Sequence, residues 1–191
     1  MNSNTNRKAE MGVGTLIIFI SLLLVAAVAA GVLIQTAGSL QQQALSTGSQ
    51  ATGQISTNAL ALEVSAEDGT DGELDNFTMV MRLAPGSEPI QLGQVTLSLA
   101  TSNTSQSFQY DQTATSGTTD MFAVEYMQEG ENHQDGVLVR GDVIEVNFLS
   151  ERLIGQSETV RVNFIPQIGT STLVRFSVPD VVSTQRVYLY P

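Results

Sequence analysis

The chain has 191 residues and no cysteine, and its 19 acidic residues against eight lysines and arginines give a formal net charge of −11. This balance argues against nucleic acid as a partner, and the lack of cysteine excludes disulfide bonds. The length allows one long helix followed by one domain of about 130 residues, which is enough to bury a hydrophobic core.

A polar N-terminal segment carrying the basic pair Arg7 and Lys8 precedes an apolar run from Gly12 to Ile34. A helix of this run, at about 1.5 Å per residue, reaches about 34 Å and would cross the hydrocarbon core of a bilayer. A secretory signal has a shorter apolar region followed by a cleavage site. We therefore expect this helix to be retained, with the basic pair on the cytoplasmic side.

No Asp, Glu, Lys or Arg occurs between Met11 and Leu62. A helix that is apolar on every side is buried in lipid or in protein, and the uncharged Gln/Ser/Thr/Gly continuation predicts that crowding by identical copies extends beyond the membrane. Small residues four apart, such as Ala27 and Gly31, allow helix backbones to approach closely. Composition alone leaves open a single-pass anchor with a loose linker.

The basic pair and the text GVGTLIIFISLLLVAAVAAGVLIQTAG, from Gly12 to Gly38, resemble the N-terminal signature of the archaellins, the subunits of the archaeal swimming filament. The segment RLAPGSEPIQLGQVTL, from Arg82 to Leu97, is similar to a second archaellin segment. The resemblance implies cleavage by a prepilin-type peptidase between Ala9 and Glu10, where family precursors usually have glycine before the cut. It implies a leader over residues 1–9, a filament-core helix over 10–58 and an outer domain over 59–191.

The resemblance also implies a helical homopolymer, joined by other archaellins, that passes from the cytoplasmic membrane to the cell surface and is rotated by a motor and assembly platform. The residues expected to form the polymerisation helix are Gly12, Gly14, Leu16, Ile20, Leu23, Ala27, Gly31 and Ile34. An adhesive type IV-like pilus subunit and a monomeric membrane-anchored binding module are alternative functions, and a leader that is never cleaved is an alternative to processing. Without the leader, 19 acids face six arginines and no lysine, which is typical of a halophilic archaeal source.

Apolar residues alternate with polar ones after the helix, which predicts half-buried strands. Glycine-rich and proline-containing turns separate the runs, and no long amphipathic helix intervenes, so the fold class is α+β: an N-terminal helix and an antiparallel, immunoglobulin-like β-sandwich. The alternating apolar residues are Leu60, Leu62 and Val64; Phe77, Met79, Met81 and Leu83; Val95, Leu97 and Leu99; Phe108 and Tyr110; Phe122, Val124 and Tyr126; Ile144, Val146 and Phe148; Val160, Val162 and Phe164; Val174, Phe176 and Val178; and Val187 and Leu189.

Candidate catalytic residues are scarce, and we expect no enzyme activity and no cofactor. The one histidine, His133, lies in the polar segment EGENHQDG and is interpreted as a solvated loop residue. The GVGT sequence lacks the Lys-Ser/Thr of a phosphate loop. An acidic turn containing Asp68, Asp71 and Asp75 has oxygen ligands suited to Ca²⁺ but lacks EF-hand spacing, so a solvated turn is favoured over a metal site.

Two triplets match the N-glycosylation sequon, at Asn76-Phe77-Thr78 and at Asn103-Thr104-Ser105. Asn103 lies in a polar connector between two predicted strands, whereas Asn76 lies within one. We expect both asparagines to be candidate glycan sites and favour Asn103.

Overall fold

The computed structural model describes residues 3–67, 73–182 and 184–191, with side chains described from Glu10 onward. The chain divides into two compact units, Met1–Gln50 and Ala51–Pro191. The elements are α1 (Ser3–Ser56), β1 (Ala59–Glu67), β2 (Leu74–Leu83), β3 (Ile90–Gln91), the 3₁₀ turn η1 (Leu92–Gln94), β4 (Thr96–Ala100), β5 (Ser105–Tyr110), β6 (Met121–Gln128), β7 (Val137–Leu138), β8 (Val143–Ile154), β9 (Thr159–Ile165), β10 (Thr172–Ser177) and β11 (Arg186–Tyr190).

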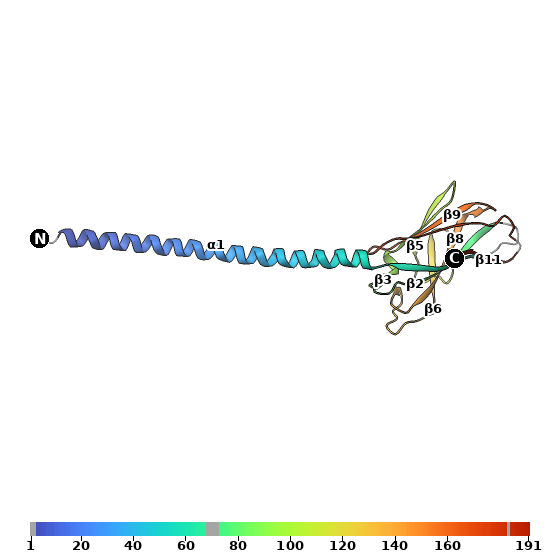
Figure 1. The fold of residues 1–191 in the computed structure, drawn as a ribbon, viewed down its shortest axis with the longest axis horizontal. Coiled ribbons are helices and arrows are strands. Elements are labelled where there is room, and N and C mark those ends of the chain that lie inside the picture. Colours follow the sequence, from blue (N-terminus) through green and yellow to red (C-terminus); the bar gives the residue numbers. More distant parts are fainter. Residues whose placement is uncertain (1–2, 68–72, 183) are drawn as a thin grey trace. The chain divides into compact units, whose positions relative to one another are not determined.

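Helix α1 is a single helix of 54 residues (Figure 1). It contains no proline and is rich in Ala and Leu, which are strong helix formers. At about 1.5 Å per residue it extends about 81 Å, well beyond the thickness of a hydrocarbon core. The helix starts seven residues before the predicted boundary at Glu10 and ends two residues before the predicted boundary at residue 58.

The C-terminal end of α1 is fixed within the second unit by hydrogen bonds. The Ser87 hydroxyl donates to the Ser56 carbonyl at 3.1 Å, and the Thr170 N–H donates to the Thr57 carbonyl at 2.9 Å. Gly169 has a φ of 120°, and a Cβ there would come within 2.6 Å of the Thr57 oxygen. These groups satisfy carbonyls that a helix end leaves without partners, and the close approach requires glycine.

The alternation predicted from the sequence is confirmed as one nine-stranded sheet within the described residues, with the order β10-β9-β4-β5-β6-β8-β2-β1-β11. Neighbouring strands are antiparallel except β5 and β6, which are parallel. Strand β10 also lies against β1 and β11, so the sheet folds over until its two ends meet. The two-residue strands β3 and β7 form a separate pair that the alternation did not predict.

The hydrophobic core fills the space between the two halves of the folded sheet. Phe77 and Phe148 are directly opposite each other on β2 and β8, and their rings stack with centroids 5.7 Å apart. Phe108 from β5 lies 5.3 Å from Phe148 and links one half of the sheet to the other. Because all three rings are fully buried, they account for a large share of the apolar area that this unit removes from water.

The predicted face of β1 is wrong at two residues. A β-bulge lies between Ala61 and Glu63, so Leu62 has no partner on β2 and is 39% exposed. Leu60 pairs with the exposed Arg82, whereas Ala61 packs against the core. One extra residue reverses the facing of every side chain before it, and the sequence pattern carries no sign of that insertion.

Candidate functional site

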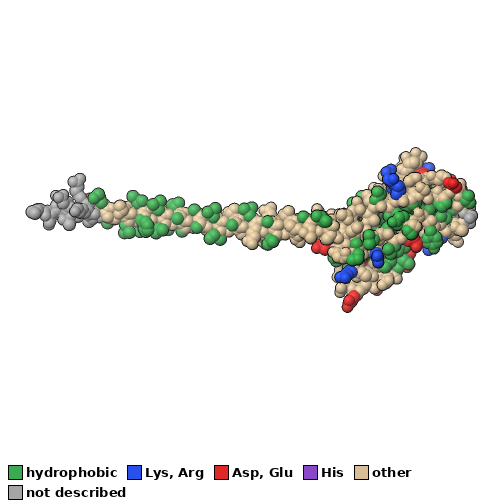
Figure 2. Space-filling model, in the orientation of Figure 1, with side chains coloured by type: hydrophobic (Ala, Val, Ile, Leu, Met, Phe, Trp, Pro, Cys, Tyr) green, Lys and Arg blue, Asp and Glu red, His purple; other side chains and the backbone are tan. Residues whose placement is uncertain are grey.

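The surface of α1 is apolar and uncovered over most of its length. Every described side chain from Glu10 to Gln50 is exposed, and Met11–Gln50 contains no Asp, Glu, Lys or Arg. Figure 2 shows hydrophobic side chains distributed along the face of the helix that is in view. Glu10–Ser56 is the one described helix whose length and composition suit a membrane span, with a most apolar window of mean hydropathy 3.0. Such a surface needs lipid or protein around it, because water is a poor solvent for it.

Hydroxyl groups on α1 hydrogen-bond to the helix's own backbone. Thr15 donates to the Gly12 carbonyl at 2.9 Å, and Ser21 donates to the Ile17 carbonyl at 2.8 Å. Thr36, in the polar continuation, donates to the Val32 carbonyl at 2.8 Å. These hydroxyls therefore require no water, and an apolar environment around them leaves no hydroxyl donor unpaired.

The residues predicted for polymerisation all lie on the exposed surface of this helix. At about 100° of rotation per residue, seven of the eight fall within a sector about 100° wide, and Gly14 lies on the opposite side. The opposite side is equally apolar, with Ile18 and Val25 61% and 67% exposed. A Cβ at Gly12 or Gly31 would meet nothing within 4 Å. Such a helix has room to pack against several others at once.

The predicted cleavage position lies in the first part of α1. The backbone there is helical on both sides of the junction between Ala9 and Glu10. The Glu10 side chain is exposed, and the Ala9 side chain lies outside the described residues.

The two sequons differ sharply in their surroundings. Asn103 is exposed in the turn between β4 and β5, where the Thr101 N–H donates to the Thr104 carbonyl at 2.9 Å. Asn76 lies inside β2 with partner strands on both sides, and Thr78 of its triplet is buried and donates to the Asn147 side chain at 2.8 Å. Only the turn therefore presents a complete, accessible triplet.

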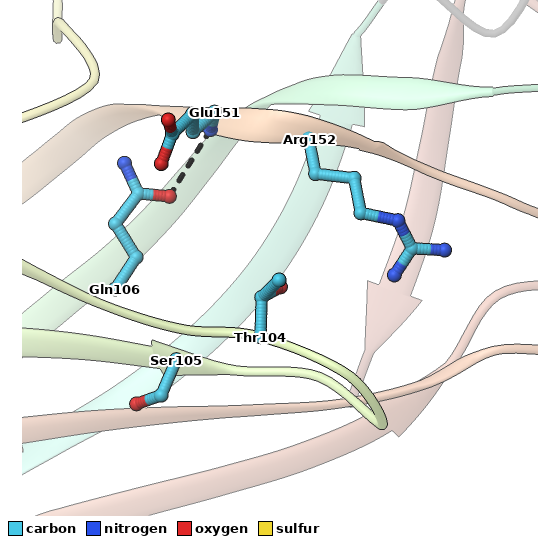
Figure 3. A pocket seen from close by; sticks show the side chains of 5 residues that line it. All are labelled: Thr104, Ser105, Gln106, Glu151 and Arg152. Atoms are coloured by element: carbon cyan, nitrogen blue, oxygen red, sulfur yellow. Dashed lines mark hydrogen bonds between the residues drawn. The ribbon is translucent and has the colours of Figure 1, made fainter.

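A pocket of about 460 Å³ lies beside the Asn103 turn. Figure 3 shows the Gln106 side chain accepting a hydrogen bond from the Glu151 N–H, at 3.0 Å. Arg152 forms a two-armed ion pair with Glu158, at 3.1 and 3.3 Å, and Glu158 also accepts a hydrogen bond from the Ser102 hydroxyl at 2.8 Å. This network holds the residue before Asn103 in place. The lining residues are Thr104, Ser105, Gln106, Glu151 and Arg152.

The acidic turn considered for calcium is only partly described. Asp68 and Asp71 lie outside the described residues, and Asp75 lies in β2. Across the described ranges, no group of three His, Cys, Asp or Glu side chains is arranged to hold a metal ion.

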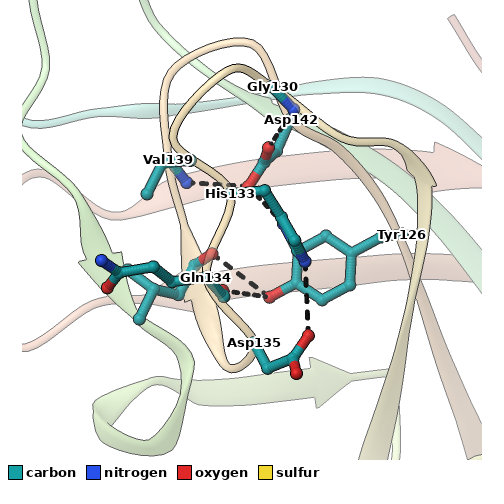
Figure 4. A network of polar contacts seen from close by, with 8 residues as sticks. Tyr126, Gly130, His133, Gln134, Asp135, Val139 and Asp142 are labelled. Atoms are coloured by element: carbon teal, nitrogen blue, oxygen red, sulfur yellow. Dashed lines mark hydrogen bonds and ion pairs between the residues drawn. The ribbon is translucent and has the colours of Figure 1, made fainter.

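The loop containing His133 is held by several side-chain contacts. The His133 ring packs edge-on to Tyr126 at 4.4 Å, and its side chain is 19% exposed, so this loop residue is only partly solvated. Its nitrogens lie 3.3 Å from Asp135 and 3.5 Å from Asp142 (Figure 4). Asp142 is fully buried and accepts hydrogen bonds from the N–H groups of Gly130, at 2.7 Å, and Val139, at 3.1 Å.

The shifted pKa values of His133 and Tyr126 are consistent with a structural role for these side chains in the loop rather than a catalytic one. Partial burial lowers the pKa of His133. Hydrogen bonds to Asp142 and Asp135 raise the pKa by more than burial lowers it, so the net pKa is above its usual 6.5. Burial raises the pKa of Tyr126 to about 12, which keeps its hydroxyl protonated as a donor to the Val137 carbonyl. Sequence reasoning missed Asp142, whose carboxylate binds the N–H of Val139, three residues before it, and the N–H of Gly130, twelve residues before it.

Comparisons with known proteins identify the family of the chain and proteins with a similar fold. The chain matches the family model for archaeal-type flagellin over residues 9–176. It is 32% identical to flagellin B1 of Methanocaldococcus jannaschii, covering 91% of each chain, and 31% identical to flagellin B3 of Halobacterium salinarum, covering 93% of this chain and 92% of the relative. Its fold is similar to a chain of the archaeal flagellum of Methanospirillum hungatei, with a TM-score of 0.71, 16% identity, and coverage of 94% of this chain and 99% of that one.

Proposed function

The chain belongs to the archaeal-type flagellin family and is a structural subunit of the archaeal swimming filament, and we propose that it assembles through the Gly12–Ile34 segment of α1 into a helical polymer on the cell surface. The observation that carries the mode of assembly is the long, charge-free surface of α1, whose side chains from Met11 to Gln50 are all exposed. The matched relatives are flagellins, in keeping with a structural role.

Before assembly, the same segment holds the precursor in the cytoplasmic membrane. Arg7 and Lys8 remain on the cytoplasmic side, and the β unit lies outside. A prepilin-type peptidase then cuts between Ala9 and Glu10, and the family match beginning at residue 9 supports this position. Mass spectrometry of purified filaments tests the proposal: the mature chain should start at Glu10, and a chain retaining Arg7 and Lys8 would contradict it.

In the filament, helices exchange lipid for one another and form a central apolar bundle, while β units form the outside. Small residues such as Ala27 and Gly31 allow the helices to approach closely. Head-to-tail contacts that do not close into a ring produce an open filament, in which other archaellins can be incorporated. The motor and assembly platform at the base rotates the filament.

Rotation for swimming distinguishes this function from a static adhesive pilus, and family membership favours swimming. Deleting the coding sequence tests this choice, with motility recorded alongside electron microscopy of surface appendages. We expect swimming to be lost while other pili remain. Retained swimming with loss of attachment would favour the adhesive pilus instead.

We further propose that Asn103 carries an N-linked glycan and Asn76 does not. Support comes from the exposed β4–β5 turn around Asn103 and from the pairing of Asn76 with strands on both sides, with Thr78 buried. In intact-mass measurements on filaments, Asn103→Gln should remove the added mass and Asn76→Gln should leave it unchanged. Unmodified peptides at both positions would contradict the proposal.

A halophilic source is proposed from the charge of the mature chain. Nineteen acids against six arginines suit a protein in high salt, where screening removes most of their mutual repulsion, and a relative of similar length comes from Halobacterium salinarum. Filaments should therefore lose stability as salt is lowered. Greatest stability in dilute buffer would contradict this source.

A further inference from the structure

Three glutamates form a row across the outer face of one half of the sheet. Glu63 on β1 pairs with Val80 on β2, Val80 pairs with Glu145 on β8, and Glu145 pairs with Glu125 on β6. Glu125 and Glu145 are therefore directly opposite each other, an arrangement that costs stability. None of the three glutamates forms an ion pair within the described residues.

A groove of about 370 Å³ lies along this acidic row. Glu63, Val80 and Glu145 line it, together with Met127, whose side chain is 61% exposed. Arg186 also borders the groove, but its guanidinium pairs with Glu67. The groove thus combines carboxylates that lack a cation with an apolar side chain.

The other half of the sheet carries the opposite charge. Arg161 on β9 and Arg175 on β10 are directly opposite each other, and both side chains are exposed. Neither has a carboxylate within 4.0 Å in the described part of the chain. Leu173 and Ile165 lie on the same outer face, 57% and 40% exposed. This arginine pair is notable in a mature chain with six arginines and no lysine.

The acidic row and the arginine pair cannot meet within one subunit. Their side chains alternate with core residues on the two halves of the folded sheet, and so point away from the shared core in opposite senses. A second copy of the chain carries both the arginines that the acidic row lacks and the carboxylates that the arginine pair lacks. A contact between two different faces is heterologous, and it repeats along an open filament.

We propose that, in the filament, the Arg161–Arg175 pair of one subunit docks onto the acidic row Glu63–Glu145–Glu125 of a neighbouring subunit, along the groove that Glu63 and Glu145 line. This contact rests on the proposed filament function and adds a specific contact between β units to the helix bundle. Each guanidinium gains a carboxylate partner, the two like-charged pairs are relieved, and Leu173 covers Met127. Electrostatic complementarity of this kind fixes the register of neighbouring subunits.

Reversing the charge at one arginine tests the contact because it should raise the melting temperature of the subunit and lower that of the filament. Arg161→Glu places a carboxylate opposite Arg175, so the full-length chain in detergent should melt on the order of 1 to 3 °C higher. Filaments of the same variant should melt about 5 °C or more below wild-type filaments. The matched control is Arg140→Glu, at an exposed arginine outside the contact and without an ion pair in the described chain, which should not weaken filaments.

A charge swap completes the test. Arg161→Glu with Arg175→Glu, or Glu125→Arg with Glu145→Arg, should each weaken the filament, and the four changes together should restore its stability, because every subunit carries both faces. Filaments of Arg161→Glu as stable as wild type would overturn the contact while leaving the filament function intact. If Glu125→Arg with Glu145→Arg weakened the filament but the two arginine substitutions did not, the contact would also be overturned, since the acidic row would then bind a different cationic partner.

Discussion

The two units of this chain differ in where their apolar side chains lie: the β unit buries most of them in a core, and α1 exposes them. Leu23 in α1 and Leu153 in β8 are about equally exposed in the isolated chain, at 53% and 51%. Leu153 is one of several exposed apolar residues in a unit with its own core, whereas Leu23 is surrounded by others like it along a helix without a core. The β unit therefore folds around its own interior, and α1 depends on an environment that other molecules provide.

The largest expected effect comes from placing a charge in α1. Leu23→Glu should abolish filaments, because an unpaired carboxylate would be buried at every repeat of the bundle. Leu153→Glu, at a position of equal exposure, should leave filaments normal. Electron microscopy and sedimentation measure both outcomes. Normal filaments from Leu23→Glu would show that α1 is not buried in the assembly.

A core substitution in the β unit should have the next largest effect. Phe148→Ala removes contacts with Phe77 and Phe108 and should cost about 3 to 5 kcal/mol of unfolding free energy. The full-length chain in detergent should then melt on the order of 10 °C lower. Phe19→Ala in α1 is the matched change outside the core and should leave this melting unchanged. Equal losses from both variants would contradict the separation of the units.

A polar substitution in the His133 loop should have a smaller effect. Asp142→Asn replaces a buried acceptor of two N–H groups with an amide that has one acceptor oxygen, which should cost about 1 to 3 kcal/mol. Asp135→Asn, at a side chain 85% exposed, should change stability by less than about 0.5 kcal/mol. Thermal melting of both variants provides the comparison, and equal losses would mean that Asp142 does not hold the loop.

The smallest expected effect is a pH dependence through His133. Its pKa is higher in the folded chain than the ordinary 6.5, so its protonated form favours folding. This stabilisation is fully present below pH 6.5 and is lost as the pH rises through the folded pKa. The melting temperature of wild type should therefore exceed that of His133→Gln more at about pH 5 than at about pH 9. A difference that is constant with pH would refute the assignment.

The sequence was sufficient for local features and insufficient for long-range ones. Continuous hydropathy identified α1, and two-residue alternation located the nine strands of the main sheet. The bulge at Leu62 changes register without changing that alternation, so the facing of Leu60 was assigned wrongly. The pairing of Arg161 with Arg175 depends on strand register between segments separated by a turn, and no local pattern in the sequence reports it.

The same distinction applies to the candidate site. Lack of charge and small-residue spacing mark the helix surface directly, because every member of that surface lies on one element. Asp142 was missed because its role depends on the N–H of Gly130, twelve residues away, as well as on that of the nearby Val139, and the loop brings Gly130 to it only on folding. The preference for Asn103 over Asn76 rests on loop composition, and the exposure of the two sequons now supports it.

The closure of the sheet has a consequence for crowding. Strand β10 lies against β1 and β11, and the Thr172 hydroxyl bonds to the Ala59 carbonyl, so backbone at one end of the sheet is covered by the other. Open strand edges on closely spaced copies would invite pairing between neighbouring chains and irreversible aggregation. Because these strand edges are covered, contacts between neighbouring β units depend on side chains rather than on backbone pairing. Lateral contacts can then change by substitution while the β unit itself stays intact.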